Sequence, residues 1–228
     1  MDRKTVSSTT PFYTLDPFNG VLASELMTAI EHAQHGDTLV WETLIEREAA
    51  LRQRLTEQGI VEPTHFTSIR WDSANLLFTS CVELNTDGRP IPIGENLTRE
   101  QFGRFPYGNG SALEYLLEHI RPNKSITEHD GESIYTDLLQ GLNQLTHGCR
   151  EAYRGHRMFE DGFAGMNISG FLTAPQVLEL RKNLSSRAWT VSFDEPLDGG
   201  VADVTKHLSA LLKAAERRRV GLVLRTHQ

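Results

Sequence analysis

The sequence predicts a mainly helical α+β fold that forms a single domain with a small antiparallel sheet. Apolar residues recur with helical spacing along most of the chain, whereas segments rich in β-branched and aromatic residues are few and short. No internal repeat and no low-complexity linker divides the sequence, and 228 residues are enough to bury a large core. We therefore expect an N-terminal arm over residues 1–19 and one globular domain over residues 20–228.

The first part of that domain is expected to contain two helices joined by a tight turn. Apolar residues keep a helical spacing over residues 22–33 and again over residues 40–55. Gly36 and Gly59 follow the two patterns and terminate them. Residues 1–19, in contrast, have no regular period, and we expect their aromatic side chains to anchor the arm on the domain.

The predicted sheet comes next in the chain. Residues 64–84 are rich in aromatic and β-branched side chains, and the Asn-Thr-Asp-Gly segment at residues 85–88 is typical of a turn. Residues 89–93 contain two prolines, which suit an edge strand because proline has no N–H to donate. We expect a small antiparallel sheet here, and further short strands at residues 189–193 and 220–225.

Four further amphipathic patterns predict helices in the rest of the chain, over residues 111–120, 132–154, 173–184 and 200–219. Ser111 and Thr173 open two of them as capping residues. The pattern over residues 132–154 is the most regular, which predicts a central packing helix. Gly141 and Gly148 lower the helix propensity of this segment by about 1 kcal/mol each, so we expect close helix packing to compensate.

The composition is that of an acidic globular protein. The chain carries 30 Asp and Glu residues against 23 Lys and Arg residues, for a net charge of -7. This balance argues against a general nucleic-acid binder. The basic run Arg217–Arg219 stands where positive charge stabilises the end of a helix. We therefore expect no nucleic-acid partner.

The sequence also indicates a compartment. It has no run of about 18 apolar residues that would cross a membrane, and its first residues are polar rather than an apolar signal core. The two cysteines, Cys81 and Cys149, lie in apolar periodic stretches, which favours buried thiols over a disulfide framework. We expect a cytoplasmic protein of bacterial type with no membrane contact.

No motif indicates a catalytic residue, a metal or a cofactor. The His35–Asp37 segment falls at a helix end, where glycine and aspartate already act as stop and cap. The polar cluster of residues 128–130 with Glu132 is too local, since three adjacent side chains do not converge on one ion. The sequence also lacks a Gly-x-Ser-x-Gly nucleophile motif. Catalytic residues therefore stay unknown, and we expect neither a metal nor a cofactor.

One loop suits a small anionic ligand. It consists of Tyr107, Gly108, Asn109, Gly110 and Ser111, and it comes just before a predicted helix. Glycine-rich loops at helix N-termini can hold phosphate on backbone N–H groups, although the lysine of a P-loop is missing here. A plain turn that leads into the serine cap is the simpler interpretation. The alternative function that this loop indicates is an enzyme or a small-ligand sensor with a pocket near residues 107–111.

The main functional expectation comes from the acidic second half of the chain. Residues 125–199 contain eleven acidic against six basic residues. The predicted partner-binding residues are acidic side chains on connections: Glu128, Asp130, Glu132, Glu160, Asp161, Asp194, Glu195 and Asp198. Loops carry many partner contacts, and acidic surfaces attract basic partners, although acidity also serves solubility alone.

We therefore expect a small acidic cytoplasmic protein that occludes a basic protein partner, as an immunity or inhibitor protein does with a toxin. The second interpretation is the enzyme or ligand sensor described above. A third is a scaffold or oligomeric protein, which requires that the helix over residues 132–154 or 200–219 exposes an apolar stripe.

Overall fold

The computed structural model describes residues 11–94, 105–125, 129–160 and 166–227 of the chain. Its strands are β1 (Phe12–Phe18), β2 (Ile120–Pro122), β3 (Met166–Leu172), β4 (Trp189–Val191) and β5 (Gly221–His227). Its helices are α1 (Gly20–Gln34), α2 (Leu39–Arg47), α3 (Ala49–Glu57), α4 (Ser73–Cys81), α6 (Ala112–His119), α7 (His129–His147), α8 (Glu151–Arg154), α9 (Ala174–Leu184) and α10 (Gly200–Arg218), with a short 3-10 helix at Phe66–Ser68. These elements confirm the predicted mainly helical α+β class with a small antiparallel sheet.

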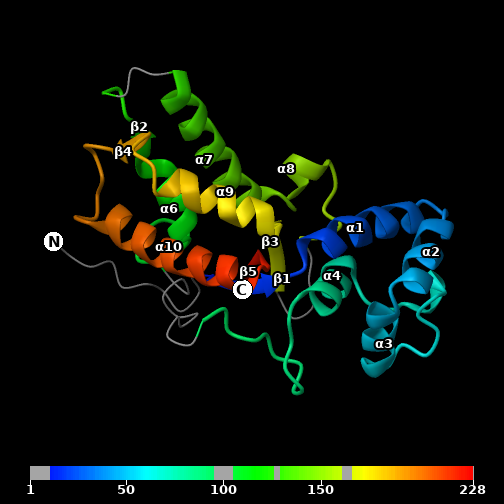
Figure 1. The fold of residues 1–228 in the computed structure, drawn as a ribbon. Coiled ribbons are helices and arrows are strands. Elements are labelled where there is room, and N and C mark those ends of the chain that lie inside the picture. Colours follow the sequence, from blue (N-terminus) through cyan, green and yellow to red (C-terminus); the bar gives the residue numbers. More distant parts are fainter. Residues whose placement is uncertain (1–10, 95–104, 126–128, 161–165, 228) are drawn as a thin grey trace.

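The centre of the molecule is a three-stranded antiparallel sheet in the order β1-β5-β3 (Figure 1). Strand β5 pairs with both neighbours, and Phe12 of β1 lies opposite His227, so the two ends of the described chain are adjacent. The register between β3 and β5 shifts between Ile168 and Gly170, as at a β-bulge. The central strand is buried on both faces, which agrees with its continuous apolar run at residues 222–224.

Helices cover both faces of this sheet and form two hydrophobic cores. The N-terminal core contains side chains of α1, α2, α3 and α4, which pack together with Val223. The C-terminal core contains side chains of α6, α7, α9 and α10, which pack with Leu222 and Leu224. Because successive side chains of a strand point to opposite faces, β5 contributes to both cores. Figure 1 shows the two helical groups on either side of the sheet.

A buried ion pair connects two strands of the sheet. The Arg225 Nη2 and Nε atoms lie 2.6 and 2.8 Å from Oδ2 of Asp16, and the two side chains are 4% and 1% exposed. The Thr14 hydroxyl donates to the same carboxylate oxygen. The guanidinium also lies over the ring of Phe78 in α4, 4.5 Å from its centroid. The pair therefore fixes β1 on β5 and connects the sheet to the N-terminal core.

The sheet predicted between residues 64 and 93 is wrong. Residues Ser73–Cys81 form α4, and only the short 3-10 helix precedes it in this region. The Asp72 side chain accepts a hydrogen bond from the Asn75 N–H and so caps the start of α4. Burial of most of this helix in the N-terminal core then outweighs its strand-like composition. The predicted turn at residues 85–88 is present, flanked by a single antiparallel bridge.

The predicted strands near the C-terminus are confirmed. Residues 189–191 form β4, which pairs with β2 in a separate two-stranded antiparallel sheet, and the predicted strand at residues 220–225 corresponds to β5. The aromatic end of the predicted arm forms the buried strand β1, whereas residues 1–10 lie outside the described part of the chain. None of the helices in that part has the length and apolar character of a membrane-spanning segment.

Two predicted helices are interrupted. The helix predicted over residues 40–55 is divided at Glu48 into α2 and α3. The helix predicted over residues 132–154 is also divided: α7 ends at His147, and the short helix α8 follows separately. A Cβ atom on Gly148 would lie 2.4 Å from the carbonyl oxygen of Gln144, so the chain turns where only glycine fits.

Candidate functional site

The loop between β4 and α10, residues 192–199, is named here the Phe193 loop. Its phenylalanine ring is fully exposed, more than any other large apolar side chain of the described residues, and Val191 at the end of β4 is also 39% exposed. Figure 1 shows this loop, in orange, at the end of the molecule away from α2 and α3. Single exposed apolar residues are common. What distinguishes this one is the set of hydrogen bonds that fixes its loop.

Hydrogen bonds to α6 and to its C-terminal end hold the Phe193 loop. The Ser192 N–H donates to the carbonyl oxygen of His119 at 2.8 Å. The Tyr115 hydroxyl donates to Oε1 of Glu195 at 3.1 Å and accepts from the Leu197 N–H at 3.3 Å. The same carboxylate oxygen accepts the first free N–H of α10. The loop is therefore ordered without a partner, and its aromatic ring still points away from the protein core.

The exposed charges of this loop are acidic. Residues 192–199 contain three acidic side chains and no basic one. Asp194 and Asp198 are exposed, whereas Glu195 is half-buried because it bonds to Tyr115. A hydrogen bond from the Ser192 hydroxyl lowers the pKa of Asp194, so this carboxylate is ionised at neutral pH. Phe193 is thus followed directly by a negative charge, although Arg121 of β2 lies near enough to Asp194 to lower its pKa further.

A cluster of aromatic rings on and beside α6 packs around Tyr115, the residue that holds the Phe193 loop. The rings of Tyr107 and Tyr115 contact in an edge arrangement with centroids 5.0 Å apart, and Tyr115 lies 4.5 Å from the imidazole of His119. Burial raises the pKa of Tyr115 to about 12, so its hydroxyl stays a hydrogen-bond donor. The His119 ring is buried, and neither of its nitrogens has a hydrogen-bond partner within the described ranges, the nearest carboxylate oxygen being that of Glu118 at 3.9 Å. Tyr107 of the predicted ligand loop and Glu195 of the predicted partner set therefore both contact Tyr115.

The rest of the predicted ligand loop caps α6. The Asn109 side-chain oxygen accepts from the Ser111 N–H at 2.9 Å, and the Ser111 hydroxyl accepts from the Glu114 N–H at 3.3 Å. Gly108 and Gly110 belong to the turn before α6 and adopt positive φ angles of 55° and 87°. Glycine tolerates such angles best. These contacts give the loop a structural role, and its ligand role stays a prediction.

The other predicted acidic residues do not gather at the Phe193 loop. Glu132 is exposed on α7, where Asp130 lies in the first turns. Glu160 follows α8, where it accepts a hydrogen bond from a backbone N–H and lies 3.8 Å from Nε of Arg157. Figure 1 places α8 beside α1, far from the loop between β4 and α10. Glu128 and Asp161 lie outside the described residues.

Sequence reasoning does not identify Phe193 as a site residue. Its segment has the composition of a strand, and an aromatic residue in a strand is expected to pack against a neighbour. The available signal is its position directly before Asp194 and Glu195, in a loop without basic residues. Full exposure of the ring depends on where the strand ends, which only the tertiary structure decides.

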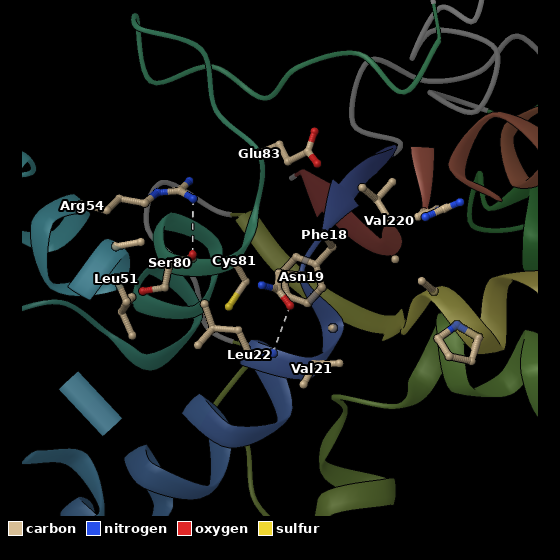
Figure 2. A pocket seen from close by; sticks show the side chains of 16 residues that line it. Phe18, Asn19, Val21, Leu22, Leu51, Arg54, Ser80, Cys81, Glu83 and Val220 are labelled. Atoms are coloured by element: carbon tan, nitrogen blue, oxygen red, sulfur yellow. Dashed lines mark hydrogen bonds between the residues drawn. The ribbon is translucent and has the colours of Figure 1, made fainter. Parts of the chain in front are cut away.

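A second feature is a cavity of about 480 Å³ between the two helical groups, named here the Arg54 pocket (Figure 2). Its walls come from the starts of α1 and α9, from α3, from the end of α4 and from the segment that joins α10 to β5. Figure 2 shows Arg54 and Ser80 on one side of this pocket and Val220 on the other. No sequence motif marks it, because its lining residues come from five separate parts of the chain.

Nucleophilic and metal chemistry find little support among the described residues. Cys81 and Cys149 are free and buried. Burial raises the pKa of both thiols, that of Cys149 to about 12, so both are protonated at neutral pH. No group of three or more His, Cys, Asp or Glu side chains in the described ranges is arranged to hold a metal ion. In the His35–Asp37 segment, the Asp37 carboxylate accepts the Leu39 N–H as a cap.

Comparisons with known proteins assign no family to this chain. No protein-family model matches the chain, and no curated protein or solved structure is significantly similar to it.

Proposed function

We propose that this chain is a binding protein that occludes a basic protein partner through the Phe193 loop, in the manner of an immunity or inhibitor protein. The observation that carries the proposal is a fully exposed aromatic ring on a loop that hydrogen bonds already hold in place. Aromatic side chains of this kind contribute much of the binding energy at protein interfaces.

The physical basis of binding has two parts. Burial of a phenylalanine side chain in a partner contributes about 1.5–3 kcal/mol, and little of this gain is lost to ordering, since Tyr115 and Glu195 already fix the loop. Asp194 and Asp198 flank the ring, where exposed charge acts mainly on the association rate and on partner choice. Together they favour a partner with an apolar cleft rimmed by Lys and Arg.

We place this protein in a reducing compartment such as the bacterial cytoplasm. Support comes from the two cysteines, which are both free thiols within the cores, since disulfides are rare in such compartments. The acidic composition suits a protein that must stay soluble while it presents an aromatic ring.

The test is partner capture from the protein's own host, with the complex measured by native mass spectrometry and its affinity by calorimetry. We expect the wild-type chain to retain a basic protein. Phe193→Ser is expected to weaken that complex at least about 30-fold, because truncation of a central aromatic costs about 2 kcal/mol or more. The double variant Asp194→Lys/Asp198→Lys is expected to slow association and to remove its dependence on salt.

Val61→Ser is the matched control, since Val61 is 88% exposed but lies outside the Phe193 loop. It should leave capture unchanged. All these variants should keep the free energy of unfolding within about 0.5 kcal/mol, because the side chains are exposed. Equal capture by the wild type and by Phe193→Ser would contradict the proposal. Self-association that is lost in Phe193→Ser would instead favour the oligomeric interpretation.

A further inference from the structure

We infer that the Arg54 pocket binds a small organic anion, a carboxylate or phosphate group on an apolar body. The pocket is separate from the Phe193 loop, and the inference does not depend on the proposed partner. It follows from three properties of the lining: an arginine that forms no ion pair among the described residues, the orientation of two helices, and apolar walls of suitable size.

The first property is a partly buried arginine without a carboxylate. Arg54 of α3 donates from Nη1 to the carbonyl oxygen of Ser80 at 3.3 Å and from Nη2 to that of Val82, both at the end of α4. No carboxylate among the described residues lies within ion-pair distance of it, although Glu57 of the same helix attracts it more weakly, and burial lowers its pKa. These two bonds fix the guanidinium and leave three of its five N–H donors for a ligand.

Arg54 differs in this respect from the other partly buried arginines. Arg150, Arg154, Arg181 and Arg225 each pair with a carboxylate. An unpaired charge that is removed from water is costly. The chain has a net charge of -7, so acidic residues that could pair with an arginine are abundant. An arginine that lacks a carboxylate at the wall of a cavity indicates that the counterion comes from a ligand.

A second arginine lines the same pocket. Arg219 follows α10 with φ of 55°, the only positive φ of a non-glycine residue in the described ranges, a conformation that most residues avoid. It is exposed, and no carboxylate among the described residues pairs with it. The acidic lining residue Glu83 is already paired with Arg218. The net charge that faces the pocket is therefore positive.

The second property is the orientation of α1 and α9. Both helices begin at the pocket, since Asn19, Val21, Ala174 and Pro175 are among its lining residues. The N-terminus of a helix carries a partial positive charge that stabilises anions within the first turn. Asn19 caps α1 and the Thr173–Gln176 capping box satisfies part of the start of α9. The dipoles of the two helices and the two arginines nevertheless favour an anionic group in this cavity.

The third property concerns the body of the ligand. Phe18, Leu22, Leu51 and Val220 supply apolar wall, and the volume of about 480 Å³ suits a small molecule. The Ser80 hydroxyl in the same wall is buried and has no hydrogen-bond partner among the described residues, which is costly unless a ligand or solvent satisfies it. A molecule with one anionic end and an apolar body matches this lining, whereas a sugar or a cation does not.

Calorimetric titration of the full chain tests the inference with four probes: hexanoate, phenyl phosphate, and their neutral counterparts hexanol and phenol. We expect saturable binding of at least one anion and none of the neutral compounds. The preferred anion then tells a carboxylate site from a phosphate site. Absence of binding by both anions at millimolar concentration would overturn the inference.

Two variants locate the site. Arg219→Gln is expected to weaken anion binding about tenfold, the usual effect of one charge-assisted hydrogen bond. Ala50→Glu, which places a carboxylate at the rim of the pocket, is expected to abolish it. Arg217→Gln is the control, because Arg217 is exposed on the same helix and does not line the pocket. Equal binding by all three variants would show surface attraction only and would overturn the inference, whereas Phe193→Ser should leave binding unchanged.

Discussion

Among single residues, the Asp16–Arg225 pair bears most directly on stability. Both side chains are buried on the face of the sheet that packs on the N-terminal core. A buried ion pair adds little net stability when intact, because both charges lose their hydration. It is nevertheless sensitive, since removal of one partner takes away a close charge–charge attraction and its hydrogen bonds in a medium of low polarity. Its main role here is to fix the register of β1 on β5.

We predict that Asp16→Asn lowers the free energy of unfolding by about 3–5 kcal/mol. The amide keeps the shape of the side chain but not its charge, so the attraction between Asp16 and the buried Arg225 guanidinium is lost. Denaturant unfolding followed by circular dichroism measures the change. Asp87→Asn, the same substitution in an exposed turn, should change stability by less than about 0.5 kcal/mol. Equal effects of the two substitutions would show that the pair does not act as described.

Among the elements, α7 makes the closest backbone approach to the sheet. A Cβ atom on Gly170 of β3 would lie 2.2 and 2.6 Å from the carbonyl oxygens of Gln144 and Leu145 in α7. The bulge in β3 falls at this position. Gly141 of α7 packs against α9 with a less severe contact. A Cβ atom there would lie 3.1 Å from Cδ1 of Leu180, which is a side-chain atom. This confirms the close packing expected at Gly141.

We predict that alanine lowers the free energy of unfolding much more at Gly170 than at Gly141. Gly170→Ala should destabilise the protein by about 1–3 kcal/mol or more, because the new methyl group meets backbone atoms that cannot move alone. Gly141→Ala should change stability by less than about 1 kcal/mol, since a flexible leucine can shift and alanine improves helix propensity. Thermal unfolding of the two variants measures both effects. A larger loss at Gly141 than at Gly170 would contradict this account.

In the molecule as a whole, β5 couples the two cores. Its successive side chains alternate between the N-terminal and the C-terminal core, and its neighbours β1 and β3 do the same. Neither group of helices can lose its packing without exposing one face of the shared sheet. This arrangement favours a single domain, and β1 belongs to it together with the part expected over residues 20–228, because β1 is a strand of the shared sheet.

We predict that the two cores unfold together. Trp41 lies in the N-terminal core and Trp189 packs on the C-terminal core. Variants that retain only one of the three tryptophans, with phenylalanine at the other two positions, report each core by fluorescence. In each variant the fluorescence midpoint should coincide with the circular dichroism midpoint of that same variant, as in a two-state transition. Separate midpoints would show two independently stable units.

The sequence by itself determined the elements that are governed by short-range chemistry. The α+β class follows from helical periodicity, the start of α6 from its serine cap, and β5 from a short apolar run between a helix and the C-terminus. The loop acidity that surrounds Phe193 can also be predicted, because charge is a property of composition. Two predicted helices are longer than those observed. One is interrupted at Glu48, and the other ends just before Gly148, where a side chain would meet the backbone of Gln144.

Tertiary structure alone decided which segments become strands and which residues form the candidate sites. Residues 73–81 have a strand-like composition but form a helix, because a cap and burial against other helices outweigh a weak local preference. The exposure of Phe193 depends on where β4 ends, and the Arg54 pocket unites residues from α1, α3, α4, α9 and the start of β5. Such sites depend on contacts between residues distant in the chain, and no local pattern records these contacts.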